Sequence, residues 1–450
     1  MVNQHYVIQK RLAQFALKHR EIHHISKSAM ESIVNDMREI MIMSQNAFAQ
    51  SLLNRIPTTS NFQIENTVDS CEVLLNDMFN TIKSARQLKR FCIQHMQMIV
   101  PRECILHTSF HNHKRIRASF CYVSILESLR HFLSHHDVGA EVIRNARKPC
   151  SSALFDYRDG SAFKDHPLFG VDSMAIRLHF YVDDFEVCNP IGSQRAVHEL
   201  MSVYFVVGNV HPKYWSQSSG IHLALLARTQ PVKNYGLEKI LEPLIADLKV
   251  LESDGICVQS CDSEYRVRGS LATISADNLG SHQVGGFRQT FSSGKMCRFC
   301  MIDFENLSQH VTEEHCVLRT ADRHASHLDG ISVDPTLCST YGVKNASPFN
   351  ELTYFSVTES LPPDAMHDIL EGLCPINVCF VLQCLIKSGK LTAKRFNEKL
   401  DLFAFSQSDM ATKPPHVPDD IASRGKLACS ASQNWCLFRN LPFCGRHCGL

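Results

Sequence analysis

The stretch IRLHFYVDD, residues 176–184, decides the fold of this chain. Apolar residues occupy every second position from Ile176 to Val182, and polar or aromatic residues fill the positions between them. A period of two is typical of a strand with one face in a core. The strand ends in two acidic residues, Asp183 and Asp184. We therefore expect a central strand that carries acid at its carboxyl end.

The segments that follow predict further strands and a helix. Residues 201–210 and 220–228 have the composition of strands, and residues 236–253 have the apolar spacing of an amphipathic helix. A fourth strand, residues 267–276, leads directly to Asp277. The order strand, strand, strand, helix, strand favours an α/β fold, in which helices pack on a mixed sheet.

Changes of composition divide the chain into four regions. We expect a helical N-terminal region (1–150), the first part of the sheet core (151–287), a Cys/His-rich insertion (288–360), and a helix with a C-terminal tail (361–450). Within the first region, the basic, His-rich residues 107–117 are interpreted as a solvated loop, with a phosphate contact as the alternative.

Composition excludes several classes of protein. The chain has 450 residues, 44% of them hydrophobic, which argues against a disordered or fibrous protein. It has 46 basic and 45 acidic residues, so any surface that binds nucleic acid must be local. A long apolar run without polar breaks is missing, and the N-terminus lacks the apolar region of a secretory signal. We therefore expect no membrane span, and mostly reduced thiols among the 19 Cys residues.

Three acidic residues are candidates for catalysis. Asp183 (or Asp184) and Asp277 end two strands, and Glu371 lies in a late predicted helix. Carboxylates from strand ends and a helix can meet at one sheet edge, hold Mg²⁺ or Mn²⁺, and support phosphoryl transfer by two metal ions. The alternative is that the aspartates cap turns and that Glu371 is merely exposed.

The Cys/His-rich insertion contains a second candidate site. Cys297 and Cys300 form a C-x₂-C pair, and His310 and His315 follow at C-x₂-C-x₉-H-x₄-H spacing, which resembles that of a structural Zn²⁺ site. Further candidate ligands are His324, His327 and His367. The alternative is a pair of buried thiols with solvent-facing histidines.

The segment from Leu361 predicts a helix with a defined start. Asp364 follows two prolines and is suited to be the N-cap. His367 and Glu371 are then four residues apart on one face, and Pro375 should kink or restart the helix. The apolar residues Ile369, Leu370 and Leu373 should pack inward. The pattern H-E-x-x-H is absent, which excludes a zincin protease.

Four strings carry a resemblance to a known family. They are YVDDFEVCNPIGS (181–193), SADNLGSHQVGGF (275–287), CRFC (297–300) and PPDAMHDILEG (362–372). Together they resemble transposase-derived proteins of animal mobile elements, similar to the CACTA (EnSpm-like) cut-and-paste transposases, over roughly residues 120–440. The resemblance implies an RNase H-like core with a DDE triad at Asp183 (alternate Asp184), Asp277 and Glu371. It also implies zinc-like elements at Cys297, Cys300 and His367.

The resemblance also sets expectations about activity. We expect a protein of the nucleus that cuts and joins DNA at transposon ends with Mg²⁺ or Mn²⁺, contains structural Zn²⁺, and forms homo-oligomers. The alternative is an inactive or domesticated copy that acts as a DNA- or protein-binding module. The short segment after Glu371 favours a truncated copy.

Overall fold

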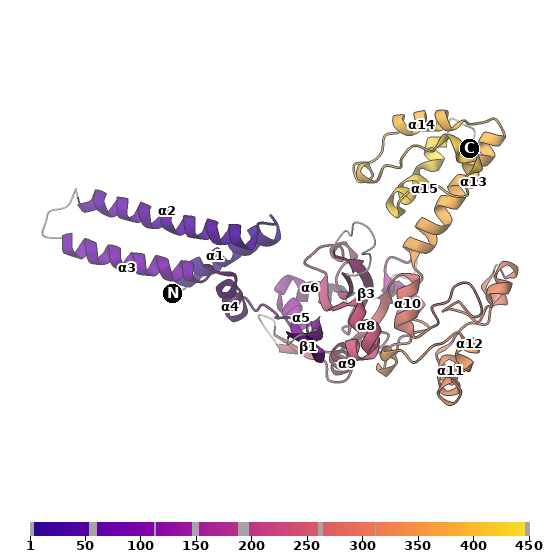
Figure 1. Cartoon of the computed structure of the whole chain (residues 1–450), viewed down its shortest axis with the longest axis horizontal. Helices are drawn as coiled ribbons and strands as arrows, with labels where there is room; N and C mark the ends of the chain where they lie inside the picture. The colour runs from indigo at the N-terminus through magenta and orange to yellow at the C-terminus, as the bar shows by residue number, and fades with distance from the viewer. Residues whose placement is uncertain are drawn as a thin grey trace. The chain divides into compact units, whose positions relative to one another are not determined.

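The structure is a computed structural model in which residues 4–53, 61–111, 114–145, 153–187, 198–259, 264–310 and 312–445 are described. The chain forms two compact units, Met1–Pro101 and Arg102–Leu450, and Figure 1 shows the course of each.

The N-terminal unit consists of helices in its described part. They are α1 (Gln4–Glu21), α2 (Lys27–Leu53), α3 (Asn61–Asn80) and α4 (Ala85–His95). The Ser26 hydroxyl accepts a hydrogen bond from the Ala29 N–H at 3.2 Å and so caps the start of α2. Residues from all four helices, such as Ala13, Val34, Phe79 and Phe91, form one apolar core. The prediction of helix for this part of the chain is confirmed.

A six-stranded mixed sheet is the centre of the second unit. Its strands are β1 (Arg102–His111), β2 (Lys114–Tyr122), β3 (Ile176–Glu186), β4 (Glu199–Val207), β5 (His222–Arg228) and β8 (Gly269–Ser275). Their spatial order is β1-β2-β5-β4-β3-β8. Strand β3 pairs antiparallel with β4 and parallel with β8. The prediction of a mixed α/β sheet is confirmed. Strand β3, which we expected to be central, is interior but lies next to the edge strand β8.

Helices and short segments surround this sheet (Figure 1). The helices are α5 (Ile125–Ser134), α6 (His136–Asn145), α7 (Ser161–Lys164), α8 (Thr229–Tyr235), α9 (Leu237–Ser253) and α10 (Asn278–Gly285), and a small hairpin consists of β6 (Ile256–Gln259) and β7 (Glu264–Val267). Helix α9 has the predicted amphipathic character, since Ile240, Leu244 and Leu248 are fully buried. Each such side chain stabilises the fold by roughly 1.5–3 kcal/mol.

The two faces of β3 are covered differently. Leu178, Phe180 and Val182 belong to the main apolar core. On the opposite face, the His179 ring lies 5.3 Å from the ring of Tyr157 and 5.2 Å from that of Trp215, measured between ring centroids. The strand is therefore buried on both faces, and only its carboxyl end, from Asp183 on, leaves the core.

Residues 102–122 correct the prediction of an entirely helical region 1–150. The solvated loop expected at 107–117 is wrong, because β1 and β2 pair antiparallel along their length, up to His111 opposite Lys114. A two-stranded ribbon that is solvated on both faces has the polar composition of a loop, and composition alone cannot separate the two. The ladder satisfies the backbone polar groups that a loop would leave to water.

The rest of the chain is partly irregular. The Cys/His-rich segment contains two helices that the sequence did not predict, α11 (Ala321–Val333) and α12 (Leu337–Tyr341). The C-terminal segment contains a π-helix, η7 (Ala365–Leu373), followed by α13 (Cys374–Lys387), α14 (Ala393–Leu402) and α15 (Ala431–Gly445). The last three share a separate apolar core.

One helical stretch of the described residues, Ala365–Lys387, is long and apolar enough to cross a membrane. By length and composition alone, a single such stretch is weak evidence for a span. The expectation that the chain has no membrane span is compatible with this finding.

Candidate active site at the carboxyl end of strand β3

The pairing of β3 with β8 brings two of the predicted acids to the same edge of the sheet. The strands are parallel, and Tyr181 lies opposite Ser275. Asp183 and Asp277 each follow two residues later, so the register carries them to neighbouring positions. Adjacent strands are about 4.8 Å apart. The two aspartates are therefore neighbours, although they are far apart in the sequence.

The charges of these acids affect one another. Asp183 is half-buried, and burial together with the negative charge of Asp277 raises the pKa of its carboxyl group. Burial also raises the pKa of Tyr181, as do the charges of Asp183, Asp364 and Asp277. Three carboxylates thus act on one phenol, which indicates a local excess of negative charge.

Asp184, the alternate first acid, lies on the opposite face of β3, because successive side chains alternate. Loss of hydration and the charges of Glu199 and Asp183 raise its pKa to about 6, while Lys233 opposes the shift. His367, by contrast, acts on Asp183. The face of β3 that carries Asp183 is therefore the one that turns towards the acidic residues of η7.

The start of η7 is built as predicted. The Asp364 carboxylate accepts hydrogen bonds from the backbone N–H groups of Met366 and His367, each at 3.1 Å, and it is the N-cap. Its second oxygen bonds Nδ1 of His367 at 2.5 Å. Pro375, which we expected to kink or restart the helix, lies in the first turn of α13, where the helix type changes from π to α. Leu373 and Cys374 both have right-handed helical φ and ψ, so the helical stretch continues through this change.

The expectation that Ile369, Leu370 and Leu373 pack inward is wrong for the two residues with the largest exposure. Ile369 is 47% exposed and Leu373 is 58% exposed. The physical reason is the helix type. A π-helix closes hydrogen bonds from residue i to i+5 and has more residues per turn, so a spacing that forms one face of an α-helix is spread around it.

His367 lies among the acidic residues. Its hydrogen bond to Asp364 is the largest cause of a raised pKa, and the charges of Asp364, Glu371 and Asp277 act in the same direction. Glu371 is exposed, as the alternative interpretation expected, and its negative charge is among the causes that raise the pKa of His367.

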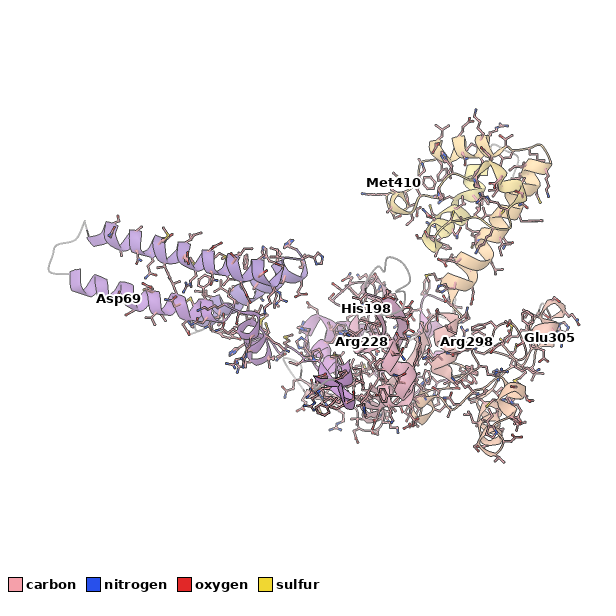
Figure 2. The ribbon with its side chains drawn as sticks, viewed as in Figure 1. Asp69, His198, Arg228, Arg298, Glu305 and Met410 are labelled. Atoms are coloured by element: carbon pink, nitrogen blue, oxygen red, sulfur yellow. The ribbon has the colours of Figure 1, made fainter. Side chains whose placement is uncertain are left out.

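Arg298, inside the Cys-Arg-Phe-Cys segment, connects that segment to the acids (Figure 2 labels Arg298). Its side chain is 4% exposed. It donates hydrogen bonds to Oδ1 of Asn278 at 2.7 Å and to the carbonyl oxygen of Pro362 at 2.8 Å. Asn278 in turn donates to Oδ1 of Asp368 at 2.6 Å. Sequence reasoning missed this bridge, since an arginine between two cysteines has no spacing pattern of its own.

The two predicted cysteine ligands lie side by side. The Phe299 N–H donates to Sγ of Cys297 at 3.3 Å. Cys300 is buried, and burial, the Cys297 thiol and Cys316 all contribute to raising its pKa to about 12. Cys316 was not predicted as a member of this cluster. Its position directly after His315 was the available signal.

The predicted histidine ligands lie in three places: His310 with His315, His324 in α11, and His367 in η7. The rings of His310 and His315 lie 6.2 Å apart, and His315 is hydrogen-bonded to Thr312. His324 is buried against Phe287, and neither of its ring nitrogens has a hydrogen-bond partner among the described residues. In the part of the chain that the structure describes, no three His, Cys, Asp or Glu side chains are arranged to hold a metal ion. The Zn²⁺ and Mg²⁺ sites stay predictions.

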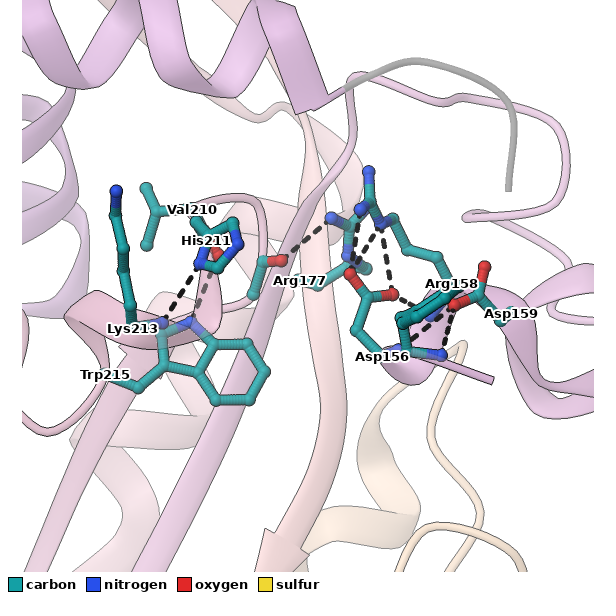
Figure 3. Close-up of polar contacts among 10 residues, drawn as sticks. Asp156, Arg158, Asp159, Arg177, Val210, His211, Lys213 and Trp215 are labelled. Carbon is teal, nitrogen blue, oxygen red and sulfur yellow. Dashed lines mark hydrogen bonds and ion pairs between the residues drawn. The ribbon is translucent and has the colours of Figure 1, made fainter. Parts of the chain in front are cut away.

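A second polar cluster stabilises the other end of β3 (Figure 3). The buried Arg177 donates to the carbonyl oxygen of Gly208 at 2.9 Å, and burial is the first cause that lowers its pKa to about 10. Nearby, Arg158 pairs with Asp156 at 2.8 Å. Trp215 donates to the Val210 carbonyl oxygen at 3.2 Å. These contacts are internal to the fold and hold the start of the strand.

Comparisons with known proteins assign no family to this site. The residues and their geometry therefore carry the functional inference. No family model matches the chain, and no curated protein matches it.

Proposed function

We propose that this protein cleaves and joins DNA as a transposase of the CACTA (EnSpm-like) type, with Asp183, Asp277 and Glu371 as its acidic triad. The observation that carries the proposal is the parallel register of β3 and β8, which makes Asp183 and Asp277 neighbours at one sheet edge. The pKa of Asp183, raised in part by the charge of Asp277, supports the same pairing.

The order of the strands supports an RNase H-like core. Strands β5, β4 and β3 form an antiparallel meander, and β8 joins the other side of β3 in parallel. Helices α8 and α9 lie between β5 and β8 in the sequence. This strand order supports the RNase H-like core that we propose, and the β1–β2 hairpin extends the sheet on the far side of β5.

The donor set suits a hard divalent cation. Asp183 and Asp277 offer carboxylate oxygens, which Mg²⁺ and Mn²⁺ prefer, and their mutual repulsion is the charge imbalance that a cation relieves. Bound there, Mg²⁺ or Mn²⁺ would activate a water or 3′-hydroxyl and stabilise the leaving oxygen.

The residues of η7 complete the site in this proposal. Asp364 uses both carboxylate oxygens to cap the helix and to orient His367. The hydrogen bond to Asp364 and the nearby acidic charges raise the pKa of His367, which favours its protonated form, and a protonated imidazole next to the acids would attract an approaching phosphate. Glu371, which has no hydrogen bond among the described residues, keeps its oxygens free for the third position.

Cys297 and Cys300 are proposed as ligands of a structural Zn²⁺. The Phe299 N–H···Sγ bond to Cys297 favours the thiolate that such an ion requires. The nearby Cys316 is the added candidate from the structure, beside His310 and His315. A site of this kind would hold the Arg298 bridge in place.

Cleavage of DNA that carries the terminal repeats of the element tests the function. In Mg²⁺ or Mn²⁺, the wild-type chain should cut it, and Asp183→Asn, Asp277→Asn and Glu371→Gln should each abolish cutting. Asp184→Asn, on the opposite face of β3, is the matched control and should keep activity. Wild-type protein that binds this DNA but never cuts it, under either metal, would support an inactive DNA-binding copy instead.

A further inference from the structure

The β1–β2 hairpin extends beyond its pairing with β5 as a two-stranded ribbon. It contacts the rest of the fold through Leu106, which packs against the main apolar core, and through the His107 ring, which stacks on Tyr235 with 6.3 Å between the ring centroids. Strand β2 pairs with β5 through Phe120, Cys121 and Tyr122 alone. Residues 105–111 and 114–119 therefore pair with each other, and no further strand among the described residues pairs with them on either side. Three apolar side chains of the ribbon are exposed: Phe110 by 74%, and Ile105 and Ile116 by 51% each.

The ribbon carries a strong local positive charge. Residues 105–119 contain Lys114, Arg115, Arg117 and three histidines, and no Asp or Glu. The whole chain has a formal charge of only +1. Arg115 and Arg117 are exposed. The ribbon is therefore a concentrated cationic element in a nearly neutral chain, which is the local surface that a polyanion needs.

The strand register puts the aromatic ring of Phe110 on the same face of the ribbon as the guanidinium groups of Arg115 and Arg117. Phe110 lies opposite Arg115, and Thr108 lies opposite Arg117. Because residues two apart share a face, and directly opposed residues do so too, these four side chains lie on one face of the ribbon. Ile116, opposite Ser109, belongs to the other face. An aromatic ring beside two arginines suits contacts to phosphates and bases.

We propose that the described part of this ribbon, residues 105–111 and 114–119, is an arm that contacts double-stranded DNA. The choice of DNA as the polyanion rests on the proposed function. The shape agrees with it, since the major groove of B-DNA is about 12 Å wide and admits a two-stranded ribbon. The major groove of duplex RNA is deep and narrow and does not. A membrane surface requires one apolar face, whereas Phe110 and Ile116 point to opposite faces.

Binding of the full-length chain to a labelled 30-base-pair DNA duplex, with EDTA present so that no cutting occurs, tests the arm. Arg115→Ala/Arg117→Ala should lower the affinity about tenfold, and should reduce the slope of log K against log salt by about 1.8, because each lost phosphate contact removes about 0.9. Phe110→Ala should lower the affinity without changing the slope, since stacking is not ionic.

The matched control is Lys394→Ala/Arg395→Ala, which removes two exposed charges from α14. It should bind as the wild type does. The ribbon variants should keep their thermal unfolding midpoint, because the changed side chains are exposed. An unchanged affinity and slope for Arg115→Ala/Arg117→Ala would contradict the proposal that the ribbon binds DNA. An equal loss of affinity in the α14 control would contradict it as well.

Two further outcomes separate the arm from the enzyme. Wild-type protein that binds DNA through the ribbon but never cuts it would contradict the proposed function, and it would still support the ribbon as a DNA-binding arm. A ribbon variant that binds and cuts as well as the wild type contradicts the arm alone. Equal binding of an RNA duplex of the same length, with the same loss in the variants, contradicts the choice of DNA.

Discussion

Arg298 donates a hydrogen bond to Oδ1 of Asn278 at 2.7 Å, and so joins the Cys-Arg-Phe-Cys segment to the residue that follows Asp277. The same guanidinium reaches the Pro362 carbonyl oxygen, just before the Asp364 cap. One buried cation thereby connects the three segments that carry the cysteines, the second aspartate and the π-helix. We expect the alignment of the acids to depend on this contact.

Replacement of Arg298 should show that dependence. We expect Arg298→Met to lower the free energy of unfolding by about 2 kcal/mol, because hydrogen bonds from a charged donor contribute about 1.5–3 kcal/mol each and part is offset by removal of a buried charge. DNA cleavage should fall, and DNA affinity should not. Urea unfolding and the two DNA assays measure this. Arg424→Met, which breaks an exposed pair with Asp420, is the control and should cost less than about 1 kcal/mol. Equal losses would contradict the bridge.

Asp277 has two separable roles. Its carboxylate caps α10 by accepting the Gly280 N–H at 2.5 Å, and its charge raises the pKa of Asp183. Asp277→Asn keeps the cap and should lower the pKa of Asp183, whereas Asp277→Ala should lower it as well and cost about 1 kcal/mol of stability. Carboxyl-carbon NMR titration and thermal unfolding distinguish the two variants. A pKa of Asp183 that does not move in either variant would mean that the carboxylates are not neighbours.

Gly286 should tolerate no side chain. Its φ is +73°, and a Cβ placed there would lie 2.1 Å from the Asn345 carbonyl oxygen. Gly286→Ala should therefore lower the free energy of unfolding by about 3 kcal/mol or more, which exceeds the cost of the left-handed backbone conformation alone. Gly294 is the matched control, with φ +64° and open space around its Cβ position, so that Gly294→Ala should cost about 1 kcal/mol. Similar losses in chemical denaturation would be evidence against the close approach.

His222 should make the sheet unit sensitive to acid. Its ring packs between Phe132 and Phe205, and burial, with a smaller effect of His131, lowers its pKa to about 4. Protonation therefore favours the unfolded state. The loss of stability is absent above about pH 6.5 and grows as the pH falls, to about 2 kcal/mol at pH 5. In urea unfolding at pH 7 and pH 5, His222→Phe should reduce the difference by that amount; an unchanged difference would contradict the assignment.

The cysteine cluster should retain zinc through purification. We expect about one Zn²⁺ per chain, and its loss in Cys297→Ser and Cys300→Ser. Cys316→Ser should lose it too if the third thiol is a ligand, whereas Cys121→Ser, an exposed thiol on β2, should not. Elemental analysis of the purified variants measures this. Wild-type protein without zinc would reduce the cluster to buried thiols.

Local patterns predicted the elements that depend on local interactions. The alternation in residues 176–184 predicted β3, the apolar spacing of residues 236–253 predicted α9, and the two prolines before Asp364 predicted its cap. Each of these follows from side-chain period or from a hydrogen bond within one turn. At residues 107–117 the prediction rested on composition and not on the spacing of apolar side chains, and it was wrong.

The amino-acid sequence by itself determined strands β3 and β8 and helix α9, and it placed an aspartate at the carboxyl end of each of the two strands. The sequence also led us to expect β3 beside the strand that ends at Asp277, and β3 does pair with β8. Only the tertiary structure decided that Arg298 reaches Asn278 and that Cys316 lies near Cys300. It also decided that η7 is a π-helix rather than an α-helix. These outcomes depend on contacts between segments distant in the chain, whose free energies exceed local propensities and leave no periodic trace in the sequence.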